Sequence, residues 1–279
     1  MTAVRTIGFV GAGRIGEPMV ERLLSAGHTV LVRARRPEVR GRLTALGAEL
    51  VDGAGDFAAC DAVVSCLYDD AQVLDVLPGV VETLGPGTVL LSHTTGAPAT
   101  LDRLDAYAPG GKAAIVDAAF SGTAEAVRAG RLTVFLGGEP DHVEVARQIV
   151  PAYADPVVAT GPRGSALRVK LLNNLLFAVI SQVTLRGLAA GRAMGITEEA
   201  LLQALAISSG GSTAGAYITA RGGAERYTQS VAPFLAKDLA ACRDTGGAVG
   251  VDLSRLLAAA QDGPMDLAEI PTTARSRTE

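Results

Sequence analysis

The chain has 279 residues, of which 48% are hydrophobic and 19% are charged, and its formal net charge is −4. This hydrophobic content excludes an intrinsically disordered chain, and the length suffices for one or two domains. An acidic chain with only 4% aromatic residues lacks the basic surface and the stacking platforms of a nucleic-acid binder, so we expect no nucleic-acid partner.

The three cysteines, Cys60, Cys66 and Cys242, form no CxxC pair and have no zinc-site spacing with a histidine. They are typical of reduced thiols in a cytoplasmic protein, and no metal site is predicted. The first ten residues contain no long apolar run of the kind that a secretory signal needs. The most apolar stretch, 171–188, is interrupted by polar residues, so we expect no membrane span.

The first half of the chain alternates short aliphatic runs with amphipathic stretches. Strands are predicted at 7–10, 28–33, 62–66, 88–92, 114–117 and 133–136, and helices between them at 17–26 and 72–84. Continuous apolar runs are typical of parallel strands buried on both faces. Repeated βα units of this kind indicate an α/β fold, with a doubly wound parallel sheet and right-handed crossovers.

The pattern changes after the turn-rich segment 160–164, and only helices are predicted from there on. They lie at 165–194, 198–208, 234–245 and 253–260. We therefore predict an α/β domain at 1–162 and an all-helical domain for substrate binding and dimerisation at 163–279.

A G-x-G-x-x-G motif directly follows the first predicted strand, at Gly11, Gly13 and Gly16. The first glycine permits a tight turn, the second lets a pyrophosphate approach the backbone, and the third lets the helix pack close to the strand. The helix N-terminus offers N–H groups and a partial positive charge to the phosphates. The first domain is therefore predicted to be a Rossmann domain. The same cofactor site includes Arg14 and Ile15.

The end of the second strand distinguishes NAD from NADP. NAD enzymes place an acid about 20 residues beyond the glycines, where it holds the ribose 2′-hydroxyl. Here that region contains Arg33, Arg35 and Arg36, and no acid precedes Glu38. Arginines at this place would bind a 2′-phosphate through charge-assisted hydrogen bonds, so NADP (NADPH) is the predicted cofactor. A solvated basic loop is the alternative.

Four segments in this order resemble the β-hydroxyacid dehydrogenase family, which includes 3-hydroxyisobutyrate dehydrogenase and tartronate semialdehyde reductase. They are IGFVGAGRIGEPM at 7–19, VDAAFSGT at 116–123, GPRGSALRVKLLNN at 161–174, and KDL at 237–239. The resemblance covers nearly the whole chain. It implies a Rossmann domain followed by a helical domain, a small carbonyl or hydroxyacid substrate, and a homodimer formed through the helical domain.

Lys170 and Asn174 are the predicted catalytic residues. They are four residues apart, so they share one face of a helix. The aliphatic residues around them would strip water from the lysine and lower its pKa, towards the ~7–8 that suits proton transfer. Asn174 would orient the amine through its amide oxygen. By resemblance, Lys170 is the general acid/base; from the residues alone, a lysine reaching the surface of a core helix is the alternative.

The resemblance also implies the remaining site residues. Backbone N–H groups of Ser121, Gly122 and Thr123, with the Ser121 hydroxyl, would bind the substrate carboxylate beside Lys170 and Asn174. Thr123 stands where the family usually has a second glycine, which would narrow the pocket. The remaining predicted cofactor contacts are Leu67, Tyr68, Thr95 and Lys237. His93 is interpreted as a hydrogen-bonded loop residue rather than as an acid.

Three other functions are alternatives to that of a hydroxyacid dehydrogenase. Imine reductases have a similar architecture and use NADP, but they typically carry Asp or Tyr where this chain has Lys170. A non-catalytic NADP-binding sensor would not need Lys170. A methyltransferase that uses S-adenosylmethionine would be expected to have an acid at the end of the second strand, where this chain has Arg33 and Arg35.

Overall fold

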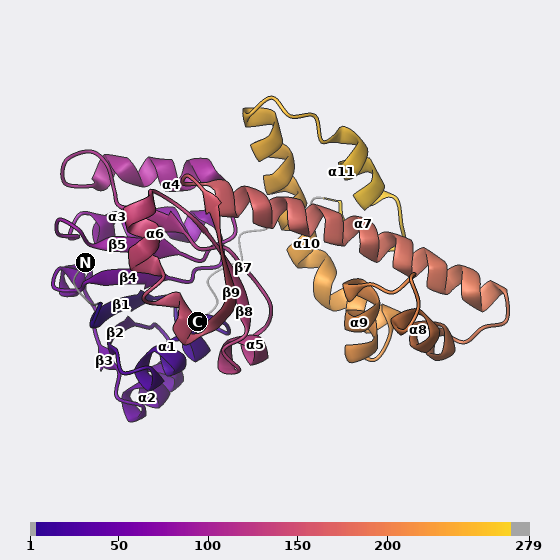
Figure 1. Cartoon of the computed structure of the whole chain (residues 1–279), viewed down its shortest axis with the longest axis horizontal. Helices are drawn as coiled ribbons and strands as arrows, with labels where there is room; N and C mark the ends of the chain where they lie inside the picture. The colour runs from indigo at the N-terminus through magenta and orange to yellow at the C-terminus, as the bar shows by residue number, and fades with distance from the viewer. Residues whose placement is uncertain (1–3, 269–279) are drawn as a thin grey trace. The chain divides into compact units, whose positions relative to one another are not determined.

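The computed structural model describes residues 4–268 and shows a nine-stranded sheet in the first half of the chain (Figure 1). The strands are β1 (Thr6–Val10), β2 (Thr29–Arg33), β3 (Glu49–Leu50), β4 (Ala62–Ser65), β5 (Val89–Ser92), β6 (Ile115–Asp117), β7 (Phe120–Ser121), β8 (Leu132–Gly137) and β9 (Ala154–Gly161). Six of them are parallel neighbours in the order β3-β2-β1-β4-β5-β6. This order is that of a doubly wound Rossmann sheet, as predicted.

The sheet departs from the parallel pattern at one edge. β8 is antiparallel to both β6 and β7, and β9 is parallel to β8. Between β6 and β8 the chain forms only the short β7 and the five-residue helix α5 (Ala124–Arg128). Antiparallel strands need no long crossover, whereas a parallel pair needs a connection of a dozen or more residues. Residues 118–131 are long enough for a crossover, but they form β7, which itself pairs antiparallel with β8, and one short helix instead of a crossover helix.

Helices cover both faces of the sheet. One face carries α1 (Gly16–Ser25), α2 (Pro37–Ala45), α5 and α6 (Pro140–Ala146), whose apolar side chains share one core. The other carries α3 (Asp70–Val81) and α4 (Pro98–Arg103), which share a second core. Short 3-10 helices lie at Ala54–Phe57, Leu104–Tyr107 and Val150–Ala152. Every residue of β4 and β5 is buried, as expected for strands covered on both faces.

Only helices are seen in the described residues after β9. They are α7 (Ser165–Ala193), α8 (Glu198–Ala206), α9 (Thr213–Ala220), α10 (Ala224–Ala248) and α11 (Ser254–Gln261). The predicted helix 234–245 is the middle of α10, which begins ten residues earlier. Pro233 lies inside α10. Because proline lacks an N–H and is unfavourable in a helix interior, the sequence predicted a helix only for the residues after it.

The chain divides into two compact units, with Lys170 the last residue of the first and Leu171 the first residue of the second. The division lies within α7. Ala166 and Leu167, in its first turns, belong to the core under α3 and α4, whereas Leu171 and the apolar residues after it belong to the helical core. The predicted limits, 1–162 and 163–279, differ from this division because they assigned all of α7 to the second domain.

α7 is long and apolar enough to cross a membrane by length and composition. The core helix of a soluble protein passes the same test. Ser181 and Gln182, near the middle of α7, are fully buried and hydrogen-bonded to other parts of the helical unit, as is typical of a core helix. The cytoplasmic location and the absence of a membrane partner stay predictions.

Candidate active site

The predicted cofactor and substrate loops of the first unit lie at one edge of the sheet. They follow the carboxyl ends of β1, β2, β4 and β5, and the end of β7. The strand order reverses between β1 and β4, whose last residues Val10 and Ser65 are paired. Ligands of open α/β sheets bind in the crevice outside such a switch point.

The glycine turn after β1 has the geometry that a dinucleotide phosphate needs. Gly11 has a φ of +94°, and a Cβ atom there would lie 2.4 Å from the carbonyl oxygen of Cys66. A Cβ on Gly16 would lie 2.3 Å from the carbonyl oxygen of Gly11, whereas one on Gly13 would meet nothing within 4 Å. No side chain caps the N-terminus of α1 at Ile15. The turn therefore presents open backbone and an uncapped helix end to an anion.

The arginines predicted to bind the 2′-phosphate come from the end of β2 and the loop after it. Arg33 is half-buried, and Arg35 and Arg36 are exposed before α2. Arg36 Nε lies 3.8 Å from Glu38 Oε1, and both side chains are more than half exposed. Exposed ion pairs of this kind contribute little, so Glu38 does not prevent Arg36 from binding a phosphate.

Hydrogen bonds fix the loops after β4 and β5. The backbone N–H of Leu67 donates to the Thr94 hydroxyl at 3.3 Å. The Asp70 carboxylate accepts from the backbone N–H of Ala97 at 2.9 Å. These two bonds hold the segment that contains the half-buried Thr95. Tyr68 is 54% exposed, so its ring is accessible at this edge.

His93 is buried beside this loop and links it to the segment after β6. Its Nδ1 contacts the carbonyl oxygen of Ala118, and its Nε2 lies 2.9 Å from the Tyr153 hydroxyl. Burial lowers the pKa of His93 to about 4. The ring is therefore neutral at neutral pH and cannot serve as a proton donor, so its interpretation as a hydrogen-bonded loop residue is confirmed.

The predicted carboxylate-binding segment begins in β7, where Ser121 pairs with Thr133 of β8. Gly122 has a φ of +139°, which favours glycine. Thr123 has an extended backbone, and its hydroxyl accepts from the N–H of Ala126 at the start of α5. Threonine therefore fits here without backbone strain, because its side chain caps a helix. The role of this segment in substrate binding stays a prediction.

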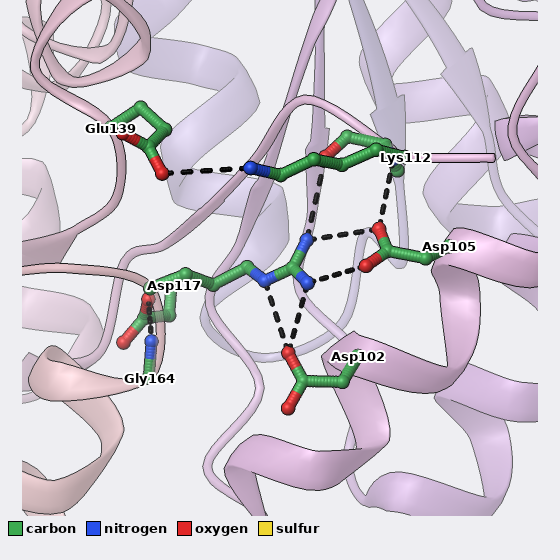
Figure 2. Close-up of polar contacts among 8 residues, drawn as sticks. Asp102, Asp105, Lys112, Asp117, Glu139 and Gly164 are labelled. Carbon is green, nitrogen blue, oxygen red and sulfur yellow. Dashed lines mark hydrogen bonds and ion pairs between the residues drawn. The ribbon is translucent and has the colours of Figure 1, made fainter. Parts of the chain in front are cut away.

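The N-terminus of α7 is held to the first unit by side chains that the sequence analysis did not assign. The buried Asp117 accepts from the N–H groups of Gly164 and Leu167. Arg163 donates to Asp105 at 2.6 Å and lies 2.9 Å from Asp102 (Figure 2). An acid closing an aliphatic strand, as Asp117 does in Ile115–Asp117, was the available sequence signal.

Lys170 follows on α7, half-buried, as the last residue of the first unit. Asn174 lies four residues later and is buried. Its Nδ2 donates to Asp238 Oδ2 on α10 at 2.5 Å, and Lys237 Nζ lies 3.2 Å from Asp238 Oδ1. Because a carboxylate only accepts, Asp238 holds the Asn174 amide with its NH₂ towards α10, and the Asn174 oxygen accepts from Asn173 Nδ2 at 3.1 Å. The sequence analysis quoted Asp238 but gave it no role.

Two family models match the chain. The model of the NAD binding domain of 6-phosphogluconate dehydrogenase matches residues 6–161, and that of the NAD-binding region of NADP-dependent 3-hydroxyisobutyrate dehydrogenase matches 164–263. A NAD-dependent L-serine dehydrogenase of Pseudomonas aeruginosa is 32% identical over 215 residues, which cover 76% of this chain and 72% of that protein. The chain belongs to the β-hydroxyacid dehydrogenase family. It is thus an oxidoreductase with an NAD(P)-binding Rossmann domain.

A second relative agrees in sequence, and two solved structures are similar in fold. Human mitochondrial 3-hydroxyisobutyrate dehydrogenase is 26% identical over 208 residues, which cover 73% of this chain but only 62% of the human protein. The structure of 3-hydroxyisobutyrate dehydrogenase from Mycobacterium tuberculosis with L-serine has a TM-score of 0.80 and 21% identity, and covers 95% of this chain and 97% of that one. An imine reductase from Streptomyces aurantiacus has a TM-score of 0.65 and 18% identity, covering 92% of each chain.

Proposed function

We propose that this β-hydroxyacid dehydrogenase is an NADP-dependent enzyme that interconverts a small β-hydroxyacid and its semialdehyde, with Lys170 as the general acid/base. The observation that carries the proposal is the placement of Lys170. It follows the helix start that Asp117 holds at the carboxyl end of β6, the edge where the glycine turn also lies. The relatives named for L-serine and 3-hydroxyisobutyrate support a substrate that carries both a hydroxyl and a carboxylate.

Each part of the chain has a separate task in this mechanism. The nicotinamide, when bound, takes up or supplies the hydride. The backbone N–H groups at 121–123, with the Ser121 hydroxyl, orient the substrate through its carboxylate. In the direction of reduction, Lys170 Nζ gives its proton to the oxygen that was the carbonyl oxygen; in oxidation it takes the proton from the hydroxyl. In this proposal the Asn174 oxygen, which accepts from Asn173 Nδ2 and has a second lone pair, orients the amine.

A substrate panel tests the proposal. We expect the protein to turn over C2–C5 semialdehydes with NADPH, and β-hydroxyacids with NADP. Turnover of cyclic imines alone would instead make it an imine reductase. Tight NADPH binding, with no turnover of either class and no effect of Lys170→Ala on its biological output, would favour a sensor.

The cofactor preference is proposed to depend on the exposed arginines after β2. We expect NADP(H) to be preferred over NAD(H), and Arg35→Ala with Arg36→Ala to reduce that preference by about 10- to 100-fold, the scale of losing a charge-assisted contact or two. The ratio of kcat/KM for the two cofactors measures it. Arg103→Ala on α4, also exposed, is the matched control. An unchanged ratio in the double variant would show that these arginines do not read the 2′-phosphate.

A homodimer formed through the helical unit is also proposed. One stripe of α7 carries exposed aliphatic side chains at spacings of four and three residues, namely Leu172, Leu176, Ile180 and Val183. A contiguous exposed apolar patch of this kind is typical of a protein–protein interface. We expect Val183→Asp to sediment as a monomer, because a buried charge without a partner is costly. Gln203→Asp, on the exposed face of α8, should keep the wild-type mass; a dimeric Val183→Asp would contradict the proposed interface.

A further inference from the structure

We propose that Asp117 is a positioning residue for the reaction, because its carboxylate fixes the first turns of α7, and hence Lys170, relative to the segment 121–123. This inference rests on the proposed function, in which Lys170 and that segment act on the same substrate. Asp117 itself touches no predicted substrate or cofactor contact; it acts through the backbone of α7.

The contacts of Asp117 join a strand end to a helix start. Its side chain is fully buried at the end of β6. One carboxylate oxygen accepts from the N–H of Gly164 at 2.6 Å (Figure 2). The other accepts from the N–H of Leu167 at 3.0 Å. The first N–H groups of a helix have no partner within it, and a negative charge is favourable there. Both oxygens are thus used in fixing α7.

These bonds fix the position of Lys170, the proposed acid/base, relative to Ser121 in the proposed carboxylate-binding segment. Lys170 comes three residues after Leu167, about one helical turn, and Ser121 comes four residues after Asp117. Ala166 and Leu167 are buried in the core of the first unit, so the start of α7 moves with the sheet. A shift of this start would move Lys170 relative to Ser121 without changing either residue.

The backbone of β8 leaves the carboxylate no room to move. Gly137 is paired with Asp117, and a Cβ atom there would lie 2.7 Å from both Asp117 Oδ1 and Ser165 Oγ. Ser165 Oγ in turn lies 2.7 Å from the Thr160 hydroxyl. A methyl group at position 137 would therefore push Asp117 and Ser165 out of place while leaving both residues in the chain.

The first test is Asp117→Asn. The amide keeps the shape of the side chain, but its NH₂ meets an N–H donor, so one of the two bonds to α7 is lost. We expect kcat to fall about 10- to 100-fold, because a misplacement of about 1 Å at a reacting group costs up to 10²-fold. The Kd for NADPH should stay unchanged, since the glycine turn after β1 is untouched.

Asp61→Asn is the matched control. The Asp61 carboxylate also accepts hydrogen bonds from two backbone N–H groups, those of Arg5 and Thr6. These bonds lie at the amino-terminal ends of β1 and β4, away from the predicted site. We expect this variant to keep the wild-type kcat. A kcat for Asp117→Asn equal to that for Asp61→Asn would overturn the proposal.

A second readout separates positioning from a general loss of stability. The chain contains only three lysines, Lys112, Lys170 and Lys237, so ¹³C-dimethylation gives three resolvable lysine signals. In Asp117→Asn we expect the chemical shift of the Lys170 signal to change, because a displaced helix start changes the surroundings of the amine. The Lys112 signal should not move. An unchanged Lys170 chemical shift would contradict the proposal.

Gly137→Ala provides a variant that retains Asp117, and it decides the question if Asp117→Asn does not fold. It should lower kcat and change the chemical shift of the Lys170 signal, as in Asp117→Asn; wild-type values for both would overturn the proposal. If the unaltered protein turns over no hydroxyacid or semialdehyde, the proposed function fails. The Lys170 chemical shift, together with hydrogen exchange at 164–170, then still tests whether Asp117 fixes this segment.

Discussion

Replacing Lys170 by methionine is expected to lower kcat about 10²- to 10⁴-fold, the range for one general acid/base group. Methionine keeps most of the length and the apolar stem of the lysine but cannot carry a proton. The substrate oxygen would then exchange its proton only with water, so the step slows while binding persists. We expect the Kd for NADPH to change little, because the predicted phosphate contacts lie in the turn after β1.

Lys112→Met is the matched control for this prediction. The Lys112 side chain is 66% exposed and lies 3.6 Å from Glu139 Oε1, in an ion pair at the surface of the first unit. Its removal should leave both kcat and the Kd for NADPH at wild-type values. A Lys170→Met protein with wild-type turnover would remove the general acid/base from the mechanism and would favour a sensor or another proton donor.

Composition sets Lys170 apart from the other cationic residues. Lysine and arginine together number 25 in this chain, yet only three of these residues are lysines. Of the three, Lys170 lies on the long apolar helix α7 and Lys237 lies beside Asp238 on α10, whereas Lys112 lies in an exposed ion pair. Arginine stays protonated at any physiological pH, whereas lysine can lose its proton when buried. Lysine rather than arginine on α7 is therefore compatible with the proposed proton transfer.

Local patterns were sufficient to predict β1, β2, β4, β5 and β6 and the glycine turn, but not the parallel strands β3 and β9. The apolar runs of β4 and β5 are buried in every residue, and the turn at Gly11 requires the positive φ that glycine provides. The helix at 165–194 was also predictable, because its apolar pattern continues without proline. A strand was predicted at 133–136, where β8 lies, but its antiparallel direction was not, since strand direction depends on how the chain returns to the sheet rather than on the composition of the strand.

The pairs that orient the site could not be read from the sequence because they join distant segments. Asn174 and Asp238 are 64 residues apart, and their contact exists only because α7 and α10 pack together. Asp117 is 47 residues from Gly164 and closes the sheet onto the start of α7. A buried carboxylate needs hydrogen-bond donors, but the sequence did not show which donors Asp117 has; only the fold identifies them.

Replacing Gln182 by leucine is expected to have the largest effect on the stability of the helical unit. Its Nε2 donates to the carbonyl oxygens of Ala260 and Met265 at 2.9 and 2.7 Å, and its Oε1 accepts from the N–H of Met265 at 2.9 Å. All three bonds are buried and join α7 to the last turn of α11 and to the segment after it. Gln182→Leu would leave three buried backbone groups without partners, at about 1–3 kcal/mol each.

We therefore expect Gln182→Leu to lower the free energy of unfolding by about 3–9 kcal/mol, a large share of the 5–15 kcal/mol typical of a domain. Urea denaturation followed by circular dichroism measures the change. Gln203→Leu is the control, because Gln203 donates only to Glu199 on the exposed face of α8 and its loss should cost less than about 0.5 kcal/mol.

Gly263→Ala tests the same contact without removing the glutamine, and it serves if Gln182→Leu does not fold. A Cβ atom at position 263 would lie 2.5 Å from Gln182 Cδ, so the side chain could not keep all three bonds. A loss of about 1–3 kcal/mol is expected from this overpacking. If both variants unfold at the wild-type urea concentration, the segment after α11 is held by its apolar contacts at Met265 and Leu267 rather than by Gln182.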